Sequence, residues 1–465
     1  MSRIWKMTLV VLAATGLAAW GVLGCSDDDA ATDGGTDSGT DTDTDTDTDT
    51  DTDADGSLEV LVLSESVSDD PAPAEGALVT LDKPGGERVE LTTGADGTVA
   101  FDGIDWALGA AAATASMDGH GMATHVGLAE ADGAITLRIP IQPVETVTLS
   151  GTVTNMSDES HDLGLVYYGC GVDAHWDSGP DYAMEVPTGV SFGLGGYEYT
   201  WEFAPSGQGQ EWTIYNFYWQ EMDAITADTT YDVTFEGDGG VETTEVSGSF
   251  DFSTTAGTPI SGTEGTGGVY AMTACDRYPL WVDGGGWLGT PVGYTSHSDI
   301  NAEGTAFDYT VEYMEPPFVD EYFTTYLVYL WTGDFMGSTE VREAGLPTPG
   351  SHAIDLLDVP VLPLIPDGGF DLNGDPFTWE SAETGARPEL VVFVGDYTWI
   401  ISGPVDATSL AIPAMVEGAP FTDMVEMSGV LSAVLLLSRE AEGSTPELWL
   451  GARAYTQEFL MSYNP

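Results

Sequence analysis

Six histidines are the residues of this chain that could bind a catalytic zinc ion. None of them has a glutamate three or four positions further on, so neither H-x-x-E nor H-E-x-x-H occurs. The sequence therefore gives no support to zinc catalysis. The six residues are His120, His125, His161, His175, His297 and His352.

One serine matches a nucleophile motif. The stretch Gly189-Val-Ser191-Phe-Gly193 fits G-x-S-x-G, which works only on a strand-to-helix turn that exposes the hydroxyl. Residues 194–201 instead predict a turn and a strand, and a chain with 58 glycines produces chance matches. We expect Ser191 to be an ordinary strand residue, and we predict no catalytic residue.

Carboxylates could act in two further ways. A pair of them about 5–10 Å apart within residues 147–465 would suit a carbohydrate-active hydrolase, and the 77 Asp and Glu residues leave this alternative open. An oxygen-rich loop could hold calcium, although Pro376 stands where the calcium loop needs glycine and a solvated turn is favoured. No other cofactor is expected. The loop residues are Asp367, Asp371, Asn373 and Asp375.

A dense aromatic run, Trp212-Thr-Ile-Tyr215-Asn-Phe-Tyr218-Trp219, could bind a sugar or a peptide if its rings were exposed. Filling the core is the favoured alternative, because tryptophan is usually buried and successive aromatics point to opposite faces of a strand. We therefore expect a strand between two packed layers.

The first 25 residues indicate export. Arg3 and Lys6 precede an apolar stretch from Met7 to Leu23, which is the order of a secretory signal. The end of this stretch, Val22-Leu-Gly-Cys25, resembles the lipobox of bacterial lipoproteins. The resemblance implies that residues 1–24 are removed and that Cys25 carries the lipid. Ser26 stands where some bacteria use Asp for inner-membrane retention, so an outer-membrane lipoprotein is favoured, at the cell surface or facing the periplasm.

The acidic composition excludes nucleic acid as a partner and marks one segment as a linker. Ten Lys and Arg against 77 Asp and Glu give a net charge of -67, and nucleic-acid binding needs a basic surface that this chain lacks. Residues 25–57 begin with the lipidated cysteine and continue as an Asp/Thr linker, which has no aromatic residue to bury and is expected to be disordered.

From residue 58 onward, short alternating runs broken by Gly, Asp, Asn and Pro predict strands. Examples are residues 77–81, 146–150, 231–235 and 307–311. The spacing predicts an all-β fold of tandem β-sandwich modules, transthyretin-like or immunoglobulin-like, behind the disordered acidic linker. One run, Val430–Leu437, could be helix or buried strand.

The first module, residues 58–146, has the turn signal Asp96-Gly97 between two strand patterns, and we expect a hairpin there. Through residues 76–81, 92–104 and 109–119, the stretch 58–142 resembles the carboxypeptidase regulatory-like domain, a small transthyretin-like β-sandwich. The resemblance implies an accessory module without an active site.

Two later segments repeat each other. Ser150-Gly151 and Ser247-Gly248 each open a segment that reaches a cysteine, Cys170 or Cys275, with a tryptophan six residues further on. We therefore expect β modules at 147–246 and 247–365, and a C-terminal one at 366–465. The last module contains the strand signals Phe377-Thr-Trp379, Trp399-Ile-Ile401 and Ser409-Leu-Ala-Ile-Pro413. These resemble the C-terminal modules of large bacterial surface lipoproteins of unassigned role. Cys170 and Cys275 could form a disulfide, or remain as two buried thiols.

These features together predict a non-enzymatic, lipid-anchored protein of the cell envelope. Its partners would be the membrane, through the lipid, and a glycan or protein ligand. A role in adhesion, binding or envelope structure fits the modules, and the carbohydrate-active hydrolase stays the alternative.

Overall fold

The computed structural model describes residues 56–65, 71–142, 145–168, 174–203, 210–235, 243–254, 264–273, 291–300, 306–315, 322–332, 335–362, 370–371, 376–395, 397–428, 430–441, 451–456 and 459–462. These residues form strands with one short α-helix, so the predicted all-β fold is confirmed. Within these ranges, no helix is both long and apolar enough to cross a membrane.

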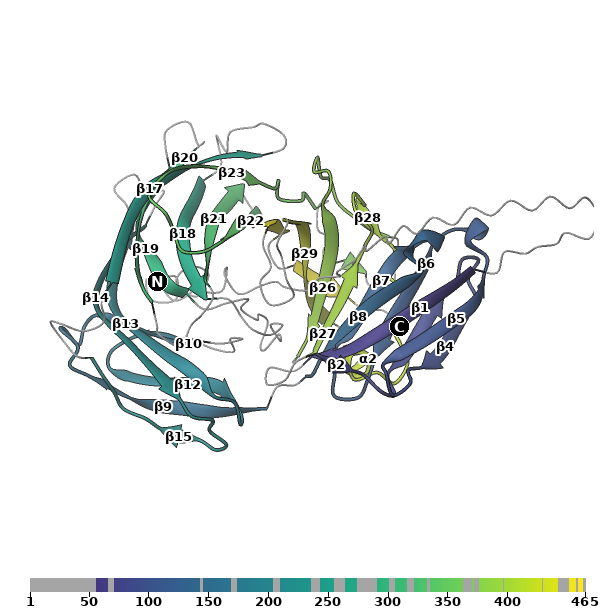
Figure 1. Ribbon diagram of the computed structural model, residues 1–465, viewed down its shortest axis with the longest axis horizontal. Coiled ribbons are helices and arrows are strands. Elements are labelled where there is room, and N and C mark those ends of the chain that lie inside the picture. Colours follow the sequence, from purple (N-terminus) through teal and green to yellow (C-terminus); the bar gives the residue numbers. More distant parts are fainter. Residues whose placement is uncertain are drawn as a thin grey trace, which may run out of the picture.

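The first module (residues 56–142) is a sandwich of two sheets (Figure 1). One sheet has the order β2-β1-β5, with β8 on β1, and the other contains β4-β3-β6-β7. Alternate residues of β1, Leu58, Val60 and Val62, are fully buried between the sheets. The elements are β1 (Gly56–Glu65), β2 (Ala72–Pro73), β3 (Leu78–Asp82), β4 (Arg88–Thr92), β5 (Thr98–Ile104), η1 (Trp106–Leu108), β6 (Ala111–Ser116), β7 (Met122–Leu128), η2 (Glu130–Asp132) and β8 (Ala134–Pro140).

The turn at Asp96-Gly97 corrects one expectation. Gly97 has the expected positive φ of 75°, but the two strands it joins, β4 and β5, pair with β3 and β1 in different sheets. The turn therefore crosses between the layers and does not close a hairpin. A Cβ at Gly97 would lie 2.7 Å from the Val62 carbonyl oxygen, so this crossing depends on a close backbone approach.

The second module (residues 145–235) also has two layers. One contains β12-β9-β15, with β16 on β9, and the other contains β11-β10-β13-β14. The strands are β9 (Thr146–Thr154), β10 (Asp162–Tyr168), β11 (Ala174–Ser178), β12 (Asp181–Pro187), β13 (Phe192–Phe203), β14 (Gln210–Met222), β15 (Thr229–Thr230) and β16 (Val233–Thr234).

The third and fourth modules cover residues 243–356 and 357–462. The third consists of β17 (Thr243–Thr254), β18 (Glu264–Thr273), β19 (Pro291–Ile300), β20 (Ala306–Met314), β21 (Tyr322–Thr332), β22 (Phe335–Ala344) and β23 (Gly350–Leu356). The fourth consists of β24 (Phe370–Asp371), β25 (Phe377–Thr378), β26 (Arg387–Val394), β27 (Tyr397–Ser402), β28 (Ser409–Leu410), α2 (Pro420–Ser428), β29 (Val430–Glu440), β30 (Gly451–Thr456) and β31 (Phe459–Ser462). The run Val430–Leu437 is therefore a buried strand.

The first three modules share one arrangement. In each, the first strand lies between an antiparallel partner and the module's last strand, which runs parallel to it: β1 between β5 and β8, β9 between β12 and β15/β16, and β17 between β20 and β23. This arrangement brings the chain's entry into each module and its exit onto one ladder.

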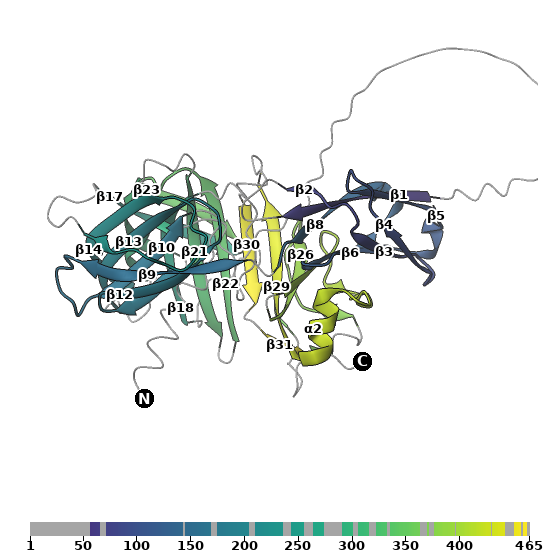
Figure 2. The same ribbon diagram turned by 90° about the horizontal axis from the view of Figure 1, so that it is seen from below.

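The modules are also joined edge to edge by backbone pairing. β7 of the first module pairs with β27 of the fourth, β30 of the fourth with β22 of the third, and β19 of the third with β14 of the second. The result is one 21-stranded hydrogen-bonded sheet that passes through all four modules. Figures 1 and 2 show β26 and β29 between the first module and the third.

Candidate functional site

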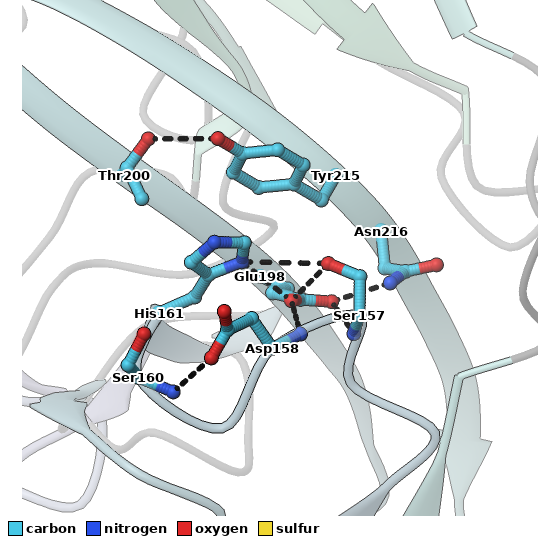
Figure 3. A network of polar contacts seen from close by, with 8 residues as sticks. All are labelled: Ser157, Asp158, Ser160, His161, Glu198, Thr200, Tyr215 and Asn216. Atoms are coloured by element: carbon cyan, nitrogen blue, oxygen red, sulfur yellow. Dashed lines mark hydrogen bonds and ion pairs between the residues drawn. The ribbon is translucent and has the colours of Figure 1, made fainter.

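A dense polar network in the second module surrounds Glu198 of β13, which is fully buried (Figure 3). Its carboxylate accepts hydrogen bonds from Ser157 N at 2.9 Å, Ser157 Oγ at 2.5 Å and Asp158 N at 3.1 Å. His161 Nδ1 lies 2.7 Å from Glu198 Oε1, and Asn216 Nδ2 donates to the other oxygen. The carboxylate thus fixes the turn before β10 to the sheet.

A β-bulge positions the outer part of this network. Glu198 pairs with Asn216 and Tyr199 pairs with Ile214, so Tyr215 is the extra residue on β14. A bulged strand re-aims its side chains. Tyr215 is 44% exposed, its ring stacks on His161 with centroids 4.1 Å apart, and its hydroxyl lies 3.2 Å from Thr200 Oγ1.

The hydrogen bonds set the charge of the site. Burial opposes ionisation of Glu198, but the donors of Ser157, Asn216 and Asp158 outweigh it and lower the pKa of the carboxyl group. An ionised carboxylate only accepts hydrogen bonds, so Nδ1 of His161 carries a proton. Hydrogen bonds from Ser160 lower the pKa of Asp158 in the same turn.

Serine, histidine and glutamate meet here, but not as a catalytic triad. A triad needs the serine on one ring nitrogen of the histidine and the carboxylate on the other. In this site Ser157 Oγ and His161 Nδ1 both contact Glu198 Oε1, and the 3.4 Å contact between Ser157 and His161 uses that same nitrogen. The serine proton is directed at the carboxylate, so the arrangement anchors a turn and does not prepare a nucleophile.

A second group of polar contacts lies between the first and fourth modules. The Gln142 side chain, 1% exposed, accepts from Thr398 N at 2.8 Å and donates to Thr398 Oγ1 at 3.0 Å. Trp399 Nε1 donates to Thr124 Oγ1 at 2.8 Å. Met122 and Val126 of β7 belong to the hydrophobic core of the fourth module. The two modules therefore share a core as well as a ladder.

The few basic residues in the described ranges have acidic neighbours, in most cases within the same module. Each of the seven Lys and Arg residues in the described ranges lies beside an acidic group. Arg138 bonds Glu65 at 2.9 Å within the first module. Lys83 and Arg88 pair with Glu87 and Asp82, Arg342 with Glu340, and Arg439 with Asp355, while Arg387 and Arg453 lie near Glu389.

Two buried carboxyl groups next to these cations are hard to ionise. Burial raises the pKa of both Glu65 and Glu389 to about 7, although Arg138 acts against the shift at Glu65 and Arg453 and Arg387 act against it at Glu389. Both groups have structural partners: Glu65 bonds Arg138, and Glu389 accepts from Ser402 Oγ at 3.1 Å. Together with Glu198, they show buried carboxylates used to fix strands and turns.

The structure describes only some of the candidate residues named from the sequence. Ser191 is exposed one residue before β13, and the strand that follows it is not the helix that a nucleophile elbow requires. Cys25, Cys170 and Cys275 lie outside the described residues, as do Asp367, Asn373 and Asp375, while Asp371 is in β24. No group of three or more His, Cys, Asp or Glu side chains suited to a metal occurs among the described residues.

The aromatic run on β14 mainly fills the core, as the pattern predicts. Phe217 is buried in the core of the third module and Trp219 packs against it, whereas Tyr218 packs against the core of the second. The strand thus lies between two layers. Tyr215 is the exception, because the bulge turns it outward.

Sequence reasoning did not identify Glu198 as the centre of a site. A signal for it exists: in Leu194-Gly-Gly-Tyr-Glu198 the glutamate shares the face of Leu194 and Gly196, which points into the second module. A charged residue at an inward position of a buried strand needs partners, but the sequence does not name them.

No family model matches the sequence, and comparison with curated proteins finds no match. Among solved structures, the chain is similar to the Bacillus anthracis TIE protein (9% identity, 65% of this chain and 50% of that chain, TM-score 0.17). It is also similar to the shaft pilin spaA from Lactobacillus rhamnosus GG (8%, 40% and 100%, TM-score 0.15) and to a putative adhesin from Bacteroides ovatus (7%, 40% and 74%, TM-score 0.13). This chain spans half of the first of these, and at such TM-scores no functional statement follows.

Proposed function

We propose that this protein is a non-enzymatic, lipid-anchored component of the bacterial cell envelope that acts in adhesion, binding or envelope architecture. The lipobox-like sequence ending at Cys25 supports the anchor, and the acidic linker would hold the folded part away from the membrane. Residues 58–142 would be an accessory module of the carboxypeptidase regulatory-like type.

The observation that carries the proposal is the continuous sheet. Backbone pairs join β7 to β27, β30 to β22 and β19 to β14, so that the modules form one extended body. Two buried polar groups among the described residues have structural roles: Gln142 joins the first module to Thr398 of the fourth, and Glu198 fixes a turn within the second. Such use of buried groups favours a structural or binding role over catalysis.

The anchor is tested by changing Cys25 to alanine and fractionating the cells. We expect the variant to leave the membrane fraction, while Ser26→Ala, which keeps the cysteine, remains there. A Cys25→Ala protein that stays with the membrane would overturn the lipoprotein proposal.

The binding role is tested with the soluble chain from residue 26 onward on arrays of glycans and of envelope proteins. Saturable binding without turnover of the ligand supports the proposal. Release of reducing ends from a bound glycan, abolished by replacing a single carboxylate, would support the hydrolase instead.

A further inference from the structure

We propose that the first module is a mechanical clamp that resists tension between the membrane tether and the rest of the protein. This inference rests on the proposed anchor, because it is the anchor that would apply the force. It follows from where the chain enters and leaves the module and from how the two strands at these points are paired.

The entry and exit strands of this module are parallel neighbours. β1 begins at Gly56, where the expected linker ends, and β8 ends at Pro140, shortly before the second module. They pair in parallel over seven consecutive positions, from Glu59 opposite Ala134 to Glu65 opposite Pro140. Main-chain bonds extend this ladder at both ends: Glu59 N donates to Gly133 O, and Ile141 N donates to Glu65 O.

This geometry decides how a force acts on the ladder. Tension pulls β1 toward its amino end and β8 toward its carboxyl end, so the strands are pulled in opposite directions along their common axis. All the slanted bonds of the parallel ladder are then loaded together. If both strands were pulled from the same end, the pairs would break one after another.

Side chains oppose the same sliding motion. Leu58, Val60 and Val62 of β1 and Ile139 of β8 have no exposed surface, so sliding must drag them through the packed core. At the exit end, Arg138 Nη1 on β8 bonds Glu65 Oε1 on β1 at 2.9 Å. The Gln142 side chain then ties the exit to Thr398 of the fourth module.

Parallel pairing of the first and last strands also occurs in the second and third modules. In the third module, β17 and β23 pair in parallel over seven positions, from Gly248 opposite Gly350 to Thr254 opposite Leu356. In the second, β9 pairs in parallel with β15 and β16 over two positions each. Tension along the chain would therefore meet a sheared ladder in each of the first three modules.

The test is single-molecule force spectroscopy on the soluble chain from residue 26 to 465, held at its amino terminus. The second attachment is a clickable side chain at exposed Glu145, which lies beyond β8 and loads the ladder in shear. In the matched protein it is at exposed Ala131, beside the amino end of β8, which peels the same ladder from one end. Both residues are exposed, so neither attachment replaces a buried side chain.

We expect the unfolding force of the first module to be at least about twofold lower with the Ala131 attachment, at the same loading rate. Equal forces in the two geometries, or a lower force with Glu145, would overturn the clamp. The soluble chain carries no lipid, so the result does not depend on Cys25. Failure of the anchor would appear only in the fractionation experiment.

Discussion

Gln142 and Thr398 are 256 residues apart in the sequence and form two hydrogen bonds with each other. The amide oxygen accepts from the backbone N–H of Thr398, and the amide nitrogen donates to its hydroxyl oxygen. Gly121 makes this contact possible, because a Cβ there would lie 2.6 Å from the Thr398 carbonyl oxygen and 2.7 Å from Gln142 Oε1. The last residue of the first module thus closes onto the fourth.

Replacing Gln142 with alanine should lower the free energy of unfolding by about 1–3 kcal/mol, because it leaves the buried Thr398 N–H without an acceptor. Urea unfolding followed by tryptophan fluorescence measures this, since Trp399 is the neighbouring residue and is fully buried. The matched control is Gln220→Ala on the exposed face of β14, which should change stability by less than about 0.5 kcal/mol. Equal effects of the two variants would show that the contact contributes nothing.

Replacing Glu198 with glutamine should destabilise the second module by about 2–4 kcal/mol. The amide NH2 would face groups that now donate hydrogen bonds to the carboxylate, so some of these bonds would be lost. Hydrogen exchange should become faster at the Ser157 and Asp158 amides in particular. The control is Glu221→Gln, an exposed glutamate on the neighbouring strand. Unchanged protection at Ser157 and Asp158 would contradict the anchoring role.

Gly151 and Gly248 should be intolerant of alanine. A Cβ at Gly151 would lie 1.9 Å from the Tyr231 carbonyl oxygen, and one at Gly248 would lie 2.5 Å from the Gly350 carbonyl oxygen. Near both glycines a tyrosine hydroxyl also donates a hydrogen bond to a backbone carbonyl close to the last strand of the same module. Tyr182 donates to Tyr231 O at 2.6 Å, and Tyr309 donates to Thr348 O at 3.2 Å.

Each alanine variant of these two glycines should cost roughly 2–4 kcal/mol, as overpacking against backbone does. Thermal unfolding by circular dichroism measures the loss. Ser150→Ala, one residue before Gly151, serves as the control and should stay within about 0.5 kcal/mol. A Gly151→Ala protein that melts with the wild type would refute the close approach.

His125 should make stability depend on pH. It lies on β7 opposite Ser402 of β27. Burial, with the nearby Arg387 charge, lowers its pKa from 6.5 to about 4, while the Asp132 charge acts in the opposite direction. Between these two values the unfolded chain binds a proton that the folded chain does not. Stability from this group is therefore complete above pH 6.5 and falls as the pH falls toward 4, by up to about 3 kcal/mol.

His125→Gln should remove this loss, which is measured as the difference between variant and wild type in urea midpoints at pH 7 and pH 4.5. Glu389→Gln provides the contrast. The pKa of Glu389 is raised from 4.5 to about 7, so its contribution is present at low pH and is lost as the pH rises through that range. The two variants should therefore change the pH profile in opposite directions, and parallel changes would refute the assignment.

The melting temperature should rise with salt. Thirteen of the 77 acidic residues lie in the linker, so 64 remain in residues 56–465 against eight Lys and Arg. Screening shortens the reach of this repulsion from about 30 Å at 0.01 M to about 3 Å at 1 M salt. Calorimetry across that range measures the effect, with an uncharged osmolyte as control. A melting temperature indifferent to sodium chloride would contradict the prediction.

Much of the secondary structure could be predicted because a strand with one buried face leaves a period of two in its residues. The runs at 77–81, 146–150 and 307–311 became β3, β9 and β20 for this reason. The prediction of a hairpin at Asp96-Gly97 was wrong, because a turn signal sets the local φ and does not decide which sheet the next strand joins. Tyr215 was assigned to a core run since a bulge leaves no mark in the alternation.

The sequence by itself determined the class of fold and the scarcity of positive charge, since both depend on residue type and local order. Only the tertiary structure decided that β7 pairs with β27, that Gln142 bonds Thr398 and that Glu198 accepts hydrogen bonds from the turn before β10. Strand edges pair through backbone groups that every residue carries, so the choice of partner depends on how whole modules pack. The order in which the modules join the sheet therefore depends on how their surfaces pack against one another.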